Sequence, residues 1–441
     1  MKYDEKYIEL IESDKEIYYK DFIKFRESVN NSKAVYKGEF IPVTYQGFFF
    51  DKEDLNRFSK WSNIMIEIGR KVTREYLENE EYRKNFKYEK ELEDLIIHDP
   101  GYDMPVVIGR YDIFYNGGED FVFCELNTDG SSAMNEEEEI TKRFLKTKGI
   151  RDFSNIYNLK LERFELFYSL IDKLTDLYND IKGDNKPNIA IVDFIDKGSN
   201  EEFEVFKNKF IEKGYNCVIC DPREVKYEDG KLKYGDFNID LVYRRAVTRD
   251  LMDRKEEIKD FLSAYKDNAF LMFGSFRSQL MHSKLIFKIL RLEETKKILT
   301  DDENSFISKH IPYTEELIND EDYMEVLENK DKYILKPYDG YASSGIYVGR
   351  DYSKEEFENI LKNIKRETYI YQDYYDVNPT KFLIFDDEGK LDILEFSHVL
   401  GLFIYGEEFS GMYSRIGRSN IVSALGDYFM APNIKISRRI D

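Results

Sequence analysis

The segment Phe123-Cys-Glu-Leu-Asn-Thr-Asp-Gly-Ser-Ser-Ala-Met-Asn135 ends an apolar run with an acid and an amide two residues apart. Because side chains alternate along a β-strand, Glu125 and Asn127 project from the same face. Upstream, residues 104–123 read MPVVIGRYDIFYNGGEDFVF, in which Asn116-Gly117-Gly118 is typical of a tight turn between two apolar runs. The sequence therefore predicts a β-hairpin with one polar face.

The register of this hairpin follows from its turn. A two-residue turn at Gly117-Gly118 places Arg110 opposite Glu125 and Asp112 opposite Phe123. Directly opposed residues share a face of the sheet, so four polar side chains are expected on one side: Arg110, Asp112, Glu125 and Asn127.

Two carboxylates and an amide oxygen on one face are hard oxygen ligands. They suit magnesium, which takes one or two carboxylates and completes its octahedron with phosphate and water. Arg110 adds a planar donor for phosphate or carboxylate. The alternative is a solvated polar face with an Asp–Arg pair, and these four residues alone do not decide between the two.

The amino-acid composition limits the classes of protein to which this chain can belong. A chain of 441 residues with 42% apolar residues is long enough for two or three subdomains. The 87 acidic against 66 basic residues give a net charge of -21, which argues against nucleic acid and anionic membranes as partners. No apolar run approaches the ~18 residues of a membrane span, and the charged start lacks a signal-peptide core. We expect a cytoplasmic protein.

The cysteines and histidines give no metal or redox motif. Three cysteines are too few for a disulfide framework, and Cys217-Val-Ile-Cys220 lies in an expected strand that sends its thiols to opposite faces. Core packing is the favoured interpretation of that pair over a metal or redox site. Cys124, next to Glu125, is expected on the hairpin's other face. The four histidines are scattered.

The pattern of apolar and polar residues changes several times along the chain. Residues 1 to about 95 have helical periodicity, and the run Glu136–Glu139 sits in the expected first turn of a helix capped by Ser or Asn, where the helix dipole favours acids. From 187 the chain reads as a βαβ unit with further strands, without a G-x-G-x-x-G fingerprint. Residues 251–330 are helical in texture, and the last third is rich in β-structure.

A second signal is the segment Tyr333-Ile-Leu-Lys336-Pro-Tyr-Asp-Gly340-Tyr-Ala-Ser-Ser-Gly345. A lysine at the end of an apolar strand precedes a run of small residues, whose backbone N–H groups can approach polyphosphate oxygens. This is not a P-loop, because no Gly-Lys-Ser/Thr opens a helix after it. The alternative is a plain hairpin with a glycine turn.

Two further segments are weaker evidence on their own. Lys284 lies at the start of an expected helix about 50 residues upstream of Lys336. Residues 369–376 form an apolar strand that runs into an aromatic stretch, which can offer backbone groups and rings to an adenine.

Together these motifs resemble the ATP-grasp superfamily, and their order resembles its circularly permuted branch, to which glutathionylspermidine synthase belongs. In a typical member the lysines and glycine loop precede the magnesium face, whereas here Arg110-x-Asp112 and Glu125-x-Asn127 come first. The resemblance covers most of residues 100–435 and concerns the synthetase half of that enzyme. It implies a mixed α/β (α+β), circularly permuted ATP-grasp fold with an inserted βαβ domain.

The resemblance divides the chain as follows: a helical N-terminal region (1–100), the magnesium-binding hairpin of the core (101–150), a βαβ pre-ATP-grasp-like domain (187–250), a helical segment (251–330), the lid subdomain (331–375) and the remainder of the core (376–441).

It also assigns residues to roles. The metal ligands would be Asp112, Glu125 and Asn127, and the catalytic arginines Arg110 and Arg415, with Arg418 as the rival of Arg415. The ATP-binding set would comprise Lys284, Lys336, Gly340, Ser343, Ser344, Gln372 and Tyr374.

The implied activity is that of an ATP-dependent carboxylate–amine ligase, which forms an amide through an acylphosphate and uses ATP with two Mg²⁺ ions. Its partners would be a small-molecule or peptide carboxylate and an amine acceptor. The stretch ALGDYFMAPNIKI (424–436) departs from the family's usual ending, so the acceptor is left open. Two alternatives are a small-molecule kinase with the same fold and a nucleotide-binding module without turnover.

Overall fold

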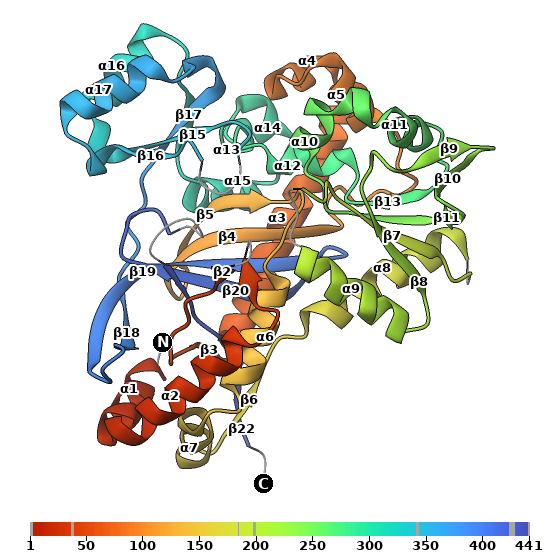
Figure 1. Cartoon of the computed structure of the whole chain (residues 1–441). Coiled ribbons are helices and arrows are strands. Elements are labelled where there is room, and N and C mark those ends of the chain that lie inside the picture. Colours follow the sequence, from red (N-terminus) through yellow and green to blue (C-terminus); the bar gives the residue numbers. More distant parts are fainter. Residues whose placement is uncertain are drawn as a thin grey trace.

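The computed structural model describes residues 3–36, 39–183, 185–196, 200–340, 344–422 and 428–439. A central antiparallel sheet lies between a smaller sheet-and-helix lobe, which we call the lid, and a domain built on a parallel sheet (Figure 1).

The central sheet carries the predicted hairpin. Its strand order is β21-β20-β19-β4-β5, and β18 pairs with the first part of β19. The bounds are β4 (Ile108–Gly117), β5 (Asp120–Asn127), β18 (Thr380–Phe385), β19 (Leu391–Tyr405), β20 (Glu408–Gly417) and β21 (Tyr428–Met430). Segments that are almost 300 residues apart in sequence, β4 and β19, are therefore neighbours in the sheet.

The hairpin forms as predicted, but its register differs. The turn falls at Gly118-Glu119, one residue later than expected, which moves each partner by two residues, and the irregularities between Tyr115 and Gly117 and between Asp112 and Ile113 offset each other. Arg110 therefore pairs with Asn127, and Asp112 with Glu125, instead of the predicted partners. Because the total shift is two residues, the four polar residues still share one face.

The parallel-sheet domain confirms the predicted βαβ unit. Its strand order is β13-β12-β7-β8, and all three pairings are parallel. The elements are β7 (Asn188–Val192), α9 (Asn200–Glu212), β8 (Asn216–Cys220), β12 (Leu241–Arg244) and β13 (Leu271–Phe273). A small antiparallel sheet of β9 (Lys226–Glu228), β10 (Lys231–Tyr234) and β11 (Phe237–Ile239) is inserted before β12. Cys217 and Cys220 are both buried free thiols, and burial raises the pKa of each to about 12.

The lid has a core of its own. Its sheet has the order β14-β17-β15-β16, and one apolar cluster, separate from the main core, packs under its two helices. The elements are β14 (Thr314–Glu316), α16 (Asp320–Glu328), β15 (Tyr333–Pro337), β16 (Tyr347–Val348), α17 (Lys354–Asn363) and β17 (Tyr369–Asp373). The lid sheet thus begins at β14, within the segment expected to be helical.

The N-terminal region contains short strands as well as the expected helices. The strands are β1 (Val35–Tyr36), β2 (Glu39–Phe40) and β3 (Phe48–Phe50), and the helices are α1 (Asp4–Ser13), α2 (Lys15–Asn30), α3 (Lys52–Glu78), α4 (Glu80–Arg83) and α5 (Lys90–Ile97). β3 pairs with β22 (Asn433–Arg438), which also pairs with β6 (Leu159–Glu162). This three-stranded sheet ties the beginning of the chain to its end.

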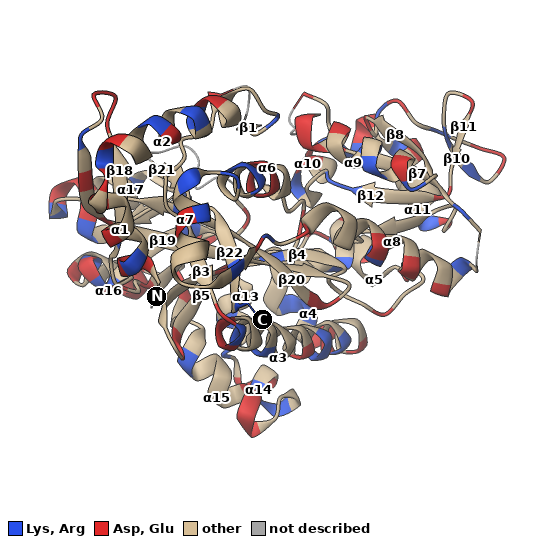
Figure 2. Ribbon diagram, turned by 90° about the horizontal axis from the view of Figure 1, so that it is seen from below, with Lys and Arg blue, Asp and Glu red and all other residues tan. Residues whose placement is uncertain are grey.

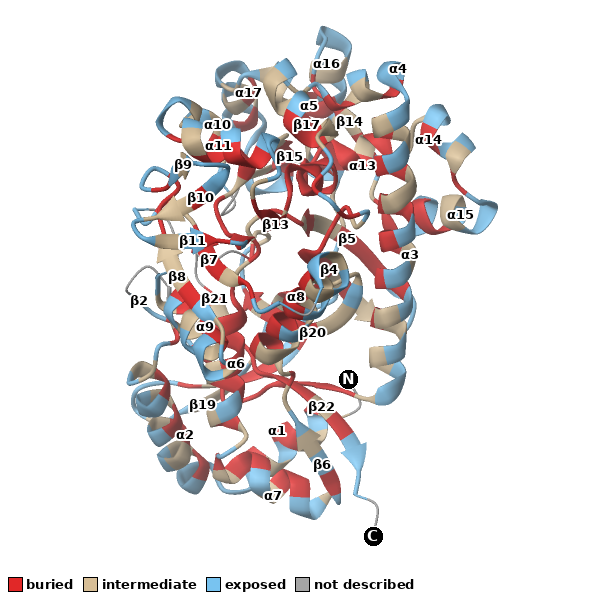
Figure 3. Ribbon diagram, turned by 90° about the vertical axis from the view of Figure 1, so that its right-hand side faces the viewer, coloured by how far each residue is buried: buried red, intermediate tan, exposed pale blue. Residues whose placement is uncertain are grey.

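The remaining α-helices connect these strands along the chain. They are α6 (Met134–Phe144), α7 (Lys148–Ile156), α8 (Leu166–Lys182), α10 (Thr248–Asp253), α11 (Lys259–Lys266), α12 (Gln279–His282), α13 (Ile286–Ile289), α14 (Glu293–Ile298) and α15 (Asp301–His310). Charged side chains lie mainly on outer helices and loops (Figure 2), whereas buried residues line the sheets and the inner helix faces (Figure 3). Among the described residues, no helix has the length and apolarity that crossing a bilayer requires.

The acidic run opens a helix, α6, as expected. Glu136, Glu137 and Glu138 are nevertheless buried. The helix start is capped by Glu202 of α9, whose carboxylate accepts the backbone N–H groups of Met134 and Asn135 at 2.9 and 3.1 Å, and not by Ser or Asn. The helix dipole depends on the helix alone, so it does not predict that neighbouring elements bury these acids.

Glu136 provides a pH-dependent test of this burial. Its pKa is raised to about 8, first by burial and then by the nearby Glu202 carboxylate. Because the folded state holds this proton more tightly than the unfolded state, stability falls as pH rises from about 4.5 towards 8. Glu136→Gln, which mimics the protonated acid, should therefore gain melting temperature over the wild type increasingly between pH 5 and pH 8.5. The exposed Glu9→Gln is the control, and a Glu136→Gln difference independent of pH would contradict the assignment.

Candidate functional site

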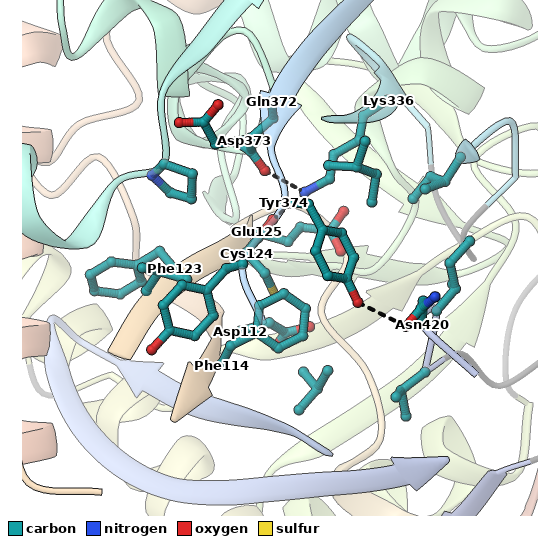
Figure 4. A pocket seen from close by; sticks show the side chains of 18 of the residues that line it. Asp112, Phe114, Phe123, Cys124, Glu125, Lys336, Gln372, Asp373, Tyr374 and Asn420 are labelled. Carbon is teal, nitrogen blue, oxygen red and sulfur yellow. Dashed lines mark hydrogen bonds between the residues drawn. The ribbon is translucent and has the colours of Figure 1, made fainter. Parts of the chain in front are cut away.

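The polar face of the hairpin opens into a pocket between the central sheet and the lid (Figure 4). The site residues come from segments that are far apart in the chain, and they meet here. Those lining the pocket are Asp112, Cys124, Glu125, Lys284, Lys336, Gln372, Asp373, Tyr374, Tyr375, Arg415 and Asn420, together with apolar residues that include Phe114, Pro312, Ile334, Val399 and Ile421.

Asp112 is held by two neighbours on the same sheet face. The guanidinium of Arg110 donates to both its carboxylate oxygens, at 2.6 and 2.8 Å, and the amide of Asn127 donates to Oδ2 at 3.0 Å. Both Arg110 and Asp112 are buried, and the Arg110 guanidinium also lies 5.2 Å from the ring centre of Tyr413. Desolvation alone would lower the pKa of Arg110, but the charge and hydrogen bonds of the Asp112 carboxylate outweigh it and raise that pKa, so the guanidinium stays charged.

Gly401 makes room for this ion pair. It lies directly opposite Asp112 on β19. A Cβ atom at Gly401 would stand 2.6 Å from Arg110 Cδ and 2.9 Å from Asp112 Oδ1, both closer than van der Waals contact. The sequence analysis did not single out this residue, because nothing in the local pattern shows that β19 pairs with β4.

Glu125 is paired with a lysine from the helical segment. Lys284 Nζ lies 2.6 Å from Glu125 Oε1 and also donates to the carbonyl oxygen of Gly340 at 2.7 Å. Burial alone would raise the pKa of Glu125, but the charge and hydrogen bond of Lys284 outweigh it and lower the pKa to about 2. Glu125 is therefore a carboxylate at any physiological pH, and Lys284 links the hairpin to the small-residue loop.

Lys336 is buried without a carboxylate partner. Its ammonium donates to Gln372 Oε1 at 2.7 Å and to the carbonyl oxygen of Cys124 at 3.0 Å (Figure 4). Among the described residues, no carboxylate oxygen lies within 4.0 Å of its nitrogen. Burial lowers the pKa of Lys336, and the more distant charge of Glu125 offsets this effect only in part. Gln372 is itself fixed by a 2.8 Å bond to Thr314 Oγ1.

The outer end of the pocket is aromatic. Tyr374 and Tyr375 follow β17, and the ring of Tyr375 lies nearly parallel to that of Phe114, at 8° and 6.3 Å between centres. The backbone N–H groups of Asp373 and Tyr374 already donate within the lid, to the carbonyl oxygens of Tyr313 and Lys332 at 2.8 and 2.7 Å. Those two groups, expected to meet an adenine edge, are thus engaged in the protein's own structure.

The remaining predicted residues are placed as follows. Arg415 lines the pocket with Nη2 at 4.0 Å from Asp112 Oδ2, whereas Arg418 is exposed beyond the end of β20. Ser344 is exposed, and Ser343 lies outside the described residues. Cys124 faces the pocket and not the opposite side, because it occupies the irregularity in β5 between Phe123 and Glu125.

The hairpin face has the chemistry that a magnesium ion requires. Asp112 and Glu125 are directly opposed across two strands, and Asn127 adds an amide oxygen on the same face. Among the described residues, no group of three His, Cys, Asp or Glu side chains is placed to hold a metal ion. The protein would therefore contribute two carboxylates to a bound magnesium ion. That is the number with which magnesium binds when phosphates and water complete its shell. Arg110 and Lys284 balance these charges in the structure.

Comparison with known proteins gives structural matches alone. No protein-family model and no curated protein sequence matches the chain. A glutathione synthetase-like effector, GSS30, from Globodera pallida aligns over 95% of this chain and 97% of its own, with a TM-score of 0.61 and 13% identity. A putative gamma-glutamylcysteine synthetase from Methylobacillus flagellatus KT (84% and 88% coverage, TM-score 0.33, 9% identity) and the ATP-grasp ligase PsnB with Mg and ADP (56% and 88%, 0.28, 12%) are also found.

The match to the effector covers nearly the whole of both chains, so the two proteins share one fold. The expectation of a mixed α/β fold is therefore confirmed, and the fold is one shared with a glutathione synthetase-like effector. At this low identity the agreement concerns the fold, and the residues of the site carry the functional argument.

Gly401→Ala tests the packing of the Arg110–Asp112 pair. The added methyl group must displace one of the two side chains, and we expect the free energy of unfolding to fall by about 1–3 kcal/mol. Gly69→Ala in α3 is the matched control, because its Cβ would meet Met281 at an ordinary 3.5 Å and the helix would gain from alanine. Urea denaturation measures both, and equal stability of the two variants would contradict the account.

Proposed function

We propose that the protein is an ATP-dependent carboxylate–amine ligase of the circularly permuted, glutathionylspermidine synthase-like type. The observation that carries this proposal is the buried ammonium of Lys336, which has no carboxylate partner and lies in the pocket that contains Asp112 and Glu125. A cation without a counter-ion is costly unless the protein binds an anion beside it. A polyphosphate fits, because Lys284 and Arg415 line the same pocket.

In this proposal each group has a physical task. Lys284 and Lys336 bind the phosphates of ATP. To reach the ammonium of Lys284, a phosphate competes with the Glu125 carboxylate and the Gly340 carbonyl oxygen. Asp112, Glu125 and Asn127 would hold magnesium, which supplies positive charge to the phosphates when bound. The aromatic outer end of the pocket, with Gln372 and Tyr374 at its edge, takes the base.

The reaction follows from the positive charge around the transferred group. A substrate carboxylate oxygen attacks the γ-phosphorus, the bond to the β–γ bridging oxygen breaks, and ADP leaves. The amine nitrogen then attacks the acyl carbon of the acylphosphate, phosphate leaves and the nitrogen loses a proton. Lys336 and Arg415, which line the pocket, stabilise the charge on the migrating phosphoryl group, and Arg110 acts through Asp112, to which it is paired. One such donor is typically worth ~3 kcal/mol, or about a hundredfold in rate.

Glu125→Gln tests the metal-binding face. The amide keeps the shape of the side chain but removes its charge, so magnesium-dependent ADP release should fall by about a hundredfold or more. Asp112→Asn should act in the same direction. Glu119→Gln, at the exposed tip of the same hairpin, is the control. Unchanged turnover in both site variants would contradict the assignment.

The substrates are found by the same assay. ADP release is measured across a panel of amino acids, peptides and polyamines, with mass detection of the products. An amide product whose mass equals the two substrates less water supports the ligase. A phosphorylated product would show a kinase, and ATP binding without any product would leave a nucleotide-binding module.

A further inference from the structure

The connection out of the lid forms one wall of the pocket. Residues 374–379 join β17 of the lid to β18 of the central sheet and have no regular secondary structure. The first two, Tyr374 and Tyr375, both line the pocket. This segment connects the lid to the central sheet, and the two have separate hydrophobic cores. Contacts that hold the segment in place therefore also hold the two tyrosine rings in the pocket wall.

Tyr374 is held by the segment that follows β20. Its hydroxyl donates to Asn420 Oδ1 at 3.0 Å (Figure 4), and the amide of Asn420 donates in turn to Asp351 of the lid. The guanidinium of Arg350 lies over the same ring, 4.0 Å from its centre, and pairs with Asp376. One asparagine of the core thus joins two points of the lid across the pocket's edge.

Tyr375 is held by the tip of the β4–β5 hairpin. Its hydroxyl donates to Asp120 Oδ1 at 2.6 Å and accepts from Asn116 Nδ2 at 2.8 Å. The amide oxygen of Asn116 accepts the backbone N–H of Asn378 at 2.7 Å, and its nitrogen lies 3.4 Å from the carbonyl oxygen of Asp376. Asn116 was expected to be a turn residue, yet its side chain spans the crossing segment.

From this geometry we propose that Asn116 and Asn420 are positioning residues for the nucleotide, acting through Tyr375 and Tyr374; the inference rests on the proposed function. A carboxamide both donates and accepts, so each asparagine bridges two partners at once. The two bridges hold the tyrosine rings at the pocket before the ligand arrives, and this preorganisation lowers the cost of ordering them on binding.

The expected signature separates positioning from catalysis. The hydroxyl groups of the two tyrosines bond to Asn420, Asp120 and Asn116 and not to the residues proposed to act on the phosphoryl group, so losing a bridge should raise KM for ATP with little change in kcat. A neutral hydrogen bond of ordinary strength corresponds to roughly a three- to tenfold weaker nucleotide affinity. A purely structural role would lower the melting temperature and leave the affinity of the folded protein unchanged.

A double-mutant cycle tests the inference. The affinity for ADP with magnesium is measured by calorimetry for Asn420→Ala, Tyr374→Phe and the double variant, and for the corresponding set Asn116→Ala and Tyr375→Phe. Each single change should weaken ADP three- to tenfold, and each double variant should lose less than the sum of its two singles, because both changes remove one shared bond. The phenylalanine variants delete one oxygen atom each and keep the test usable where an alanine variant fails to fold.

Matched controls use the same substitutions elsewhere. Asn363→Ala lies at the exposed end of α17, and Tyr168→Phe removes an exposed hydroxyl that binds Glu212; both should bind ADP as the wild type does. Wild-type affinity in all four single variants, or additive losses in the doubles, would overturn the inference while the proposed function stands. A wild-type protein that binds no ADP would overturn both.

Discussion

Buried charge has to be neutralised, and this constraint shapes the pocket. Asp112 is paired with Arg110, and Glu125 with Lys284, so both carboxylates of the hairpin are compensated by cations from the protein itself. Lys336 breaks the pattern, since its ammonium bonds to neutral oxygens alone among the described residues. The inner pocket is consequently short of negative charge, and a polyphosphate is the chemical class that supplies it.

The strand order makes this charge arrangement possible. β4 lies between β5 and β19, so Asp112 faces Glu125 on one side and Gly401 on the other. The carboxylate on β5 provides the second carboxylate of the proposed magnesium site, and the missing side chain on β19 provides the space that the Arg110 pair occupies. The lid then places Lys336 above the same face, although it follows the hairpin by more than 200 residues in the chain.

Sequence reasoning could predict what depends on local pattern. The alternation in Glu125-x-Asn127 and Arg110-x-Asp112 predicts a shared polar face, and that parity survives the register shift because the shift is an even number of residues. The apolar pattern of residues 188–220 likewise predicts two buried strands joined by a helix, which is a βαβ unit. The position of Cys124 in the pocket was not predicted, because it results from a strand irregularity that leaves no mark in the sequence periodicity. Gly401, Asn420 and the bridging role of Asn116 depend on contacts between distant segments, and a single sequence carries no signal for them.

The most direct test of this account compares nucleotide affinity and stability in Lys336→Met. Calorimetric titration with ATP and magnesium should show affinity weakened about a hundredfold or more, while the melting temperature without ligand should not fall, because methionine removes a buried charge that lacks a counter-ion. Lys381→Met, on the exposed side of β18, is the control for both measurements. ATP affinity unchanged from that of the wild type would contradict the claim that Lys336 is held ready for phosphate.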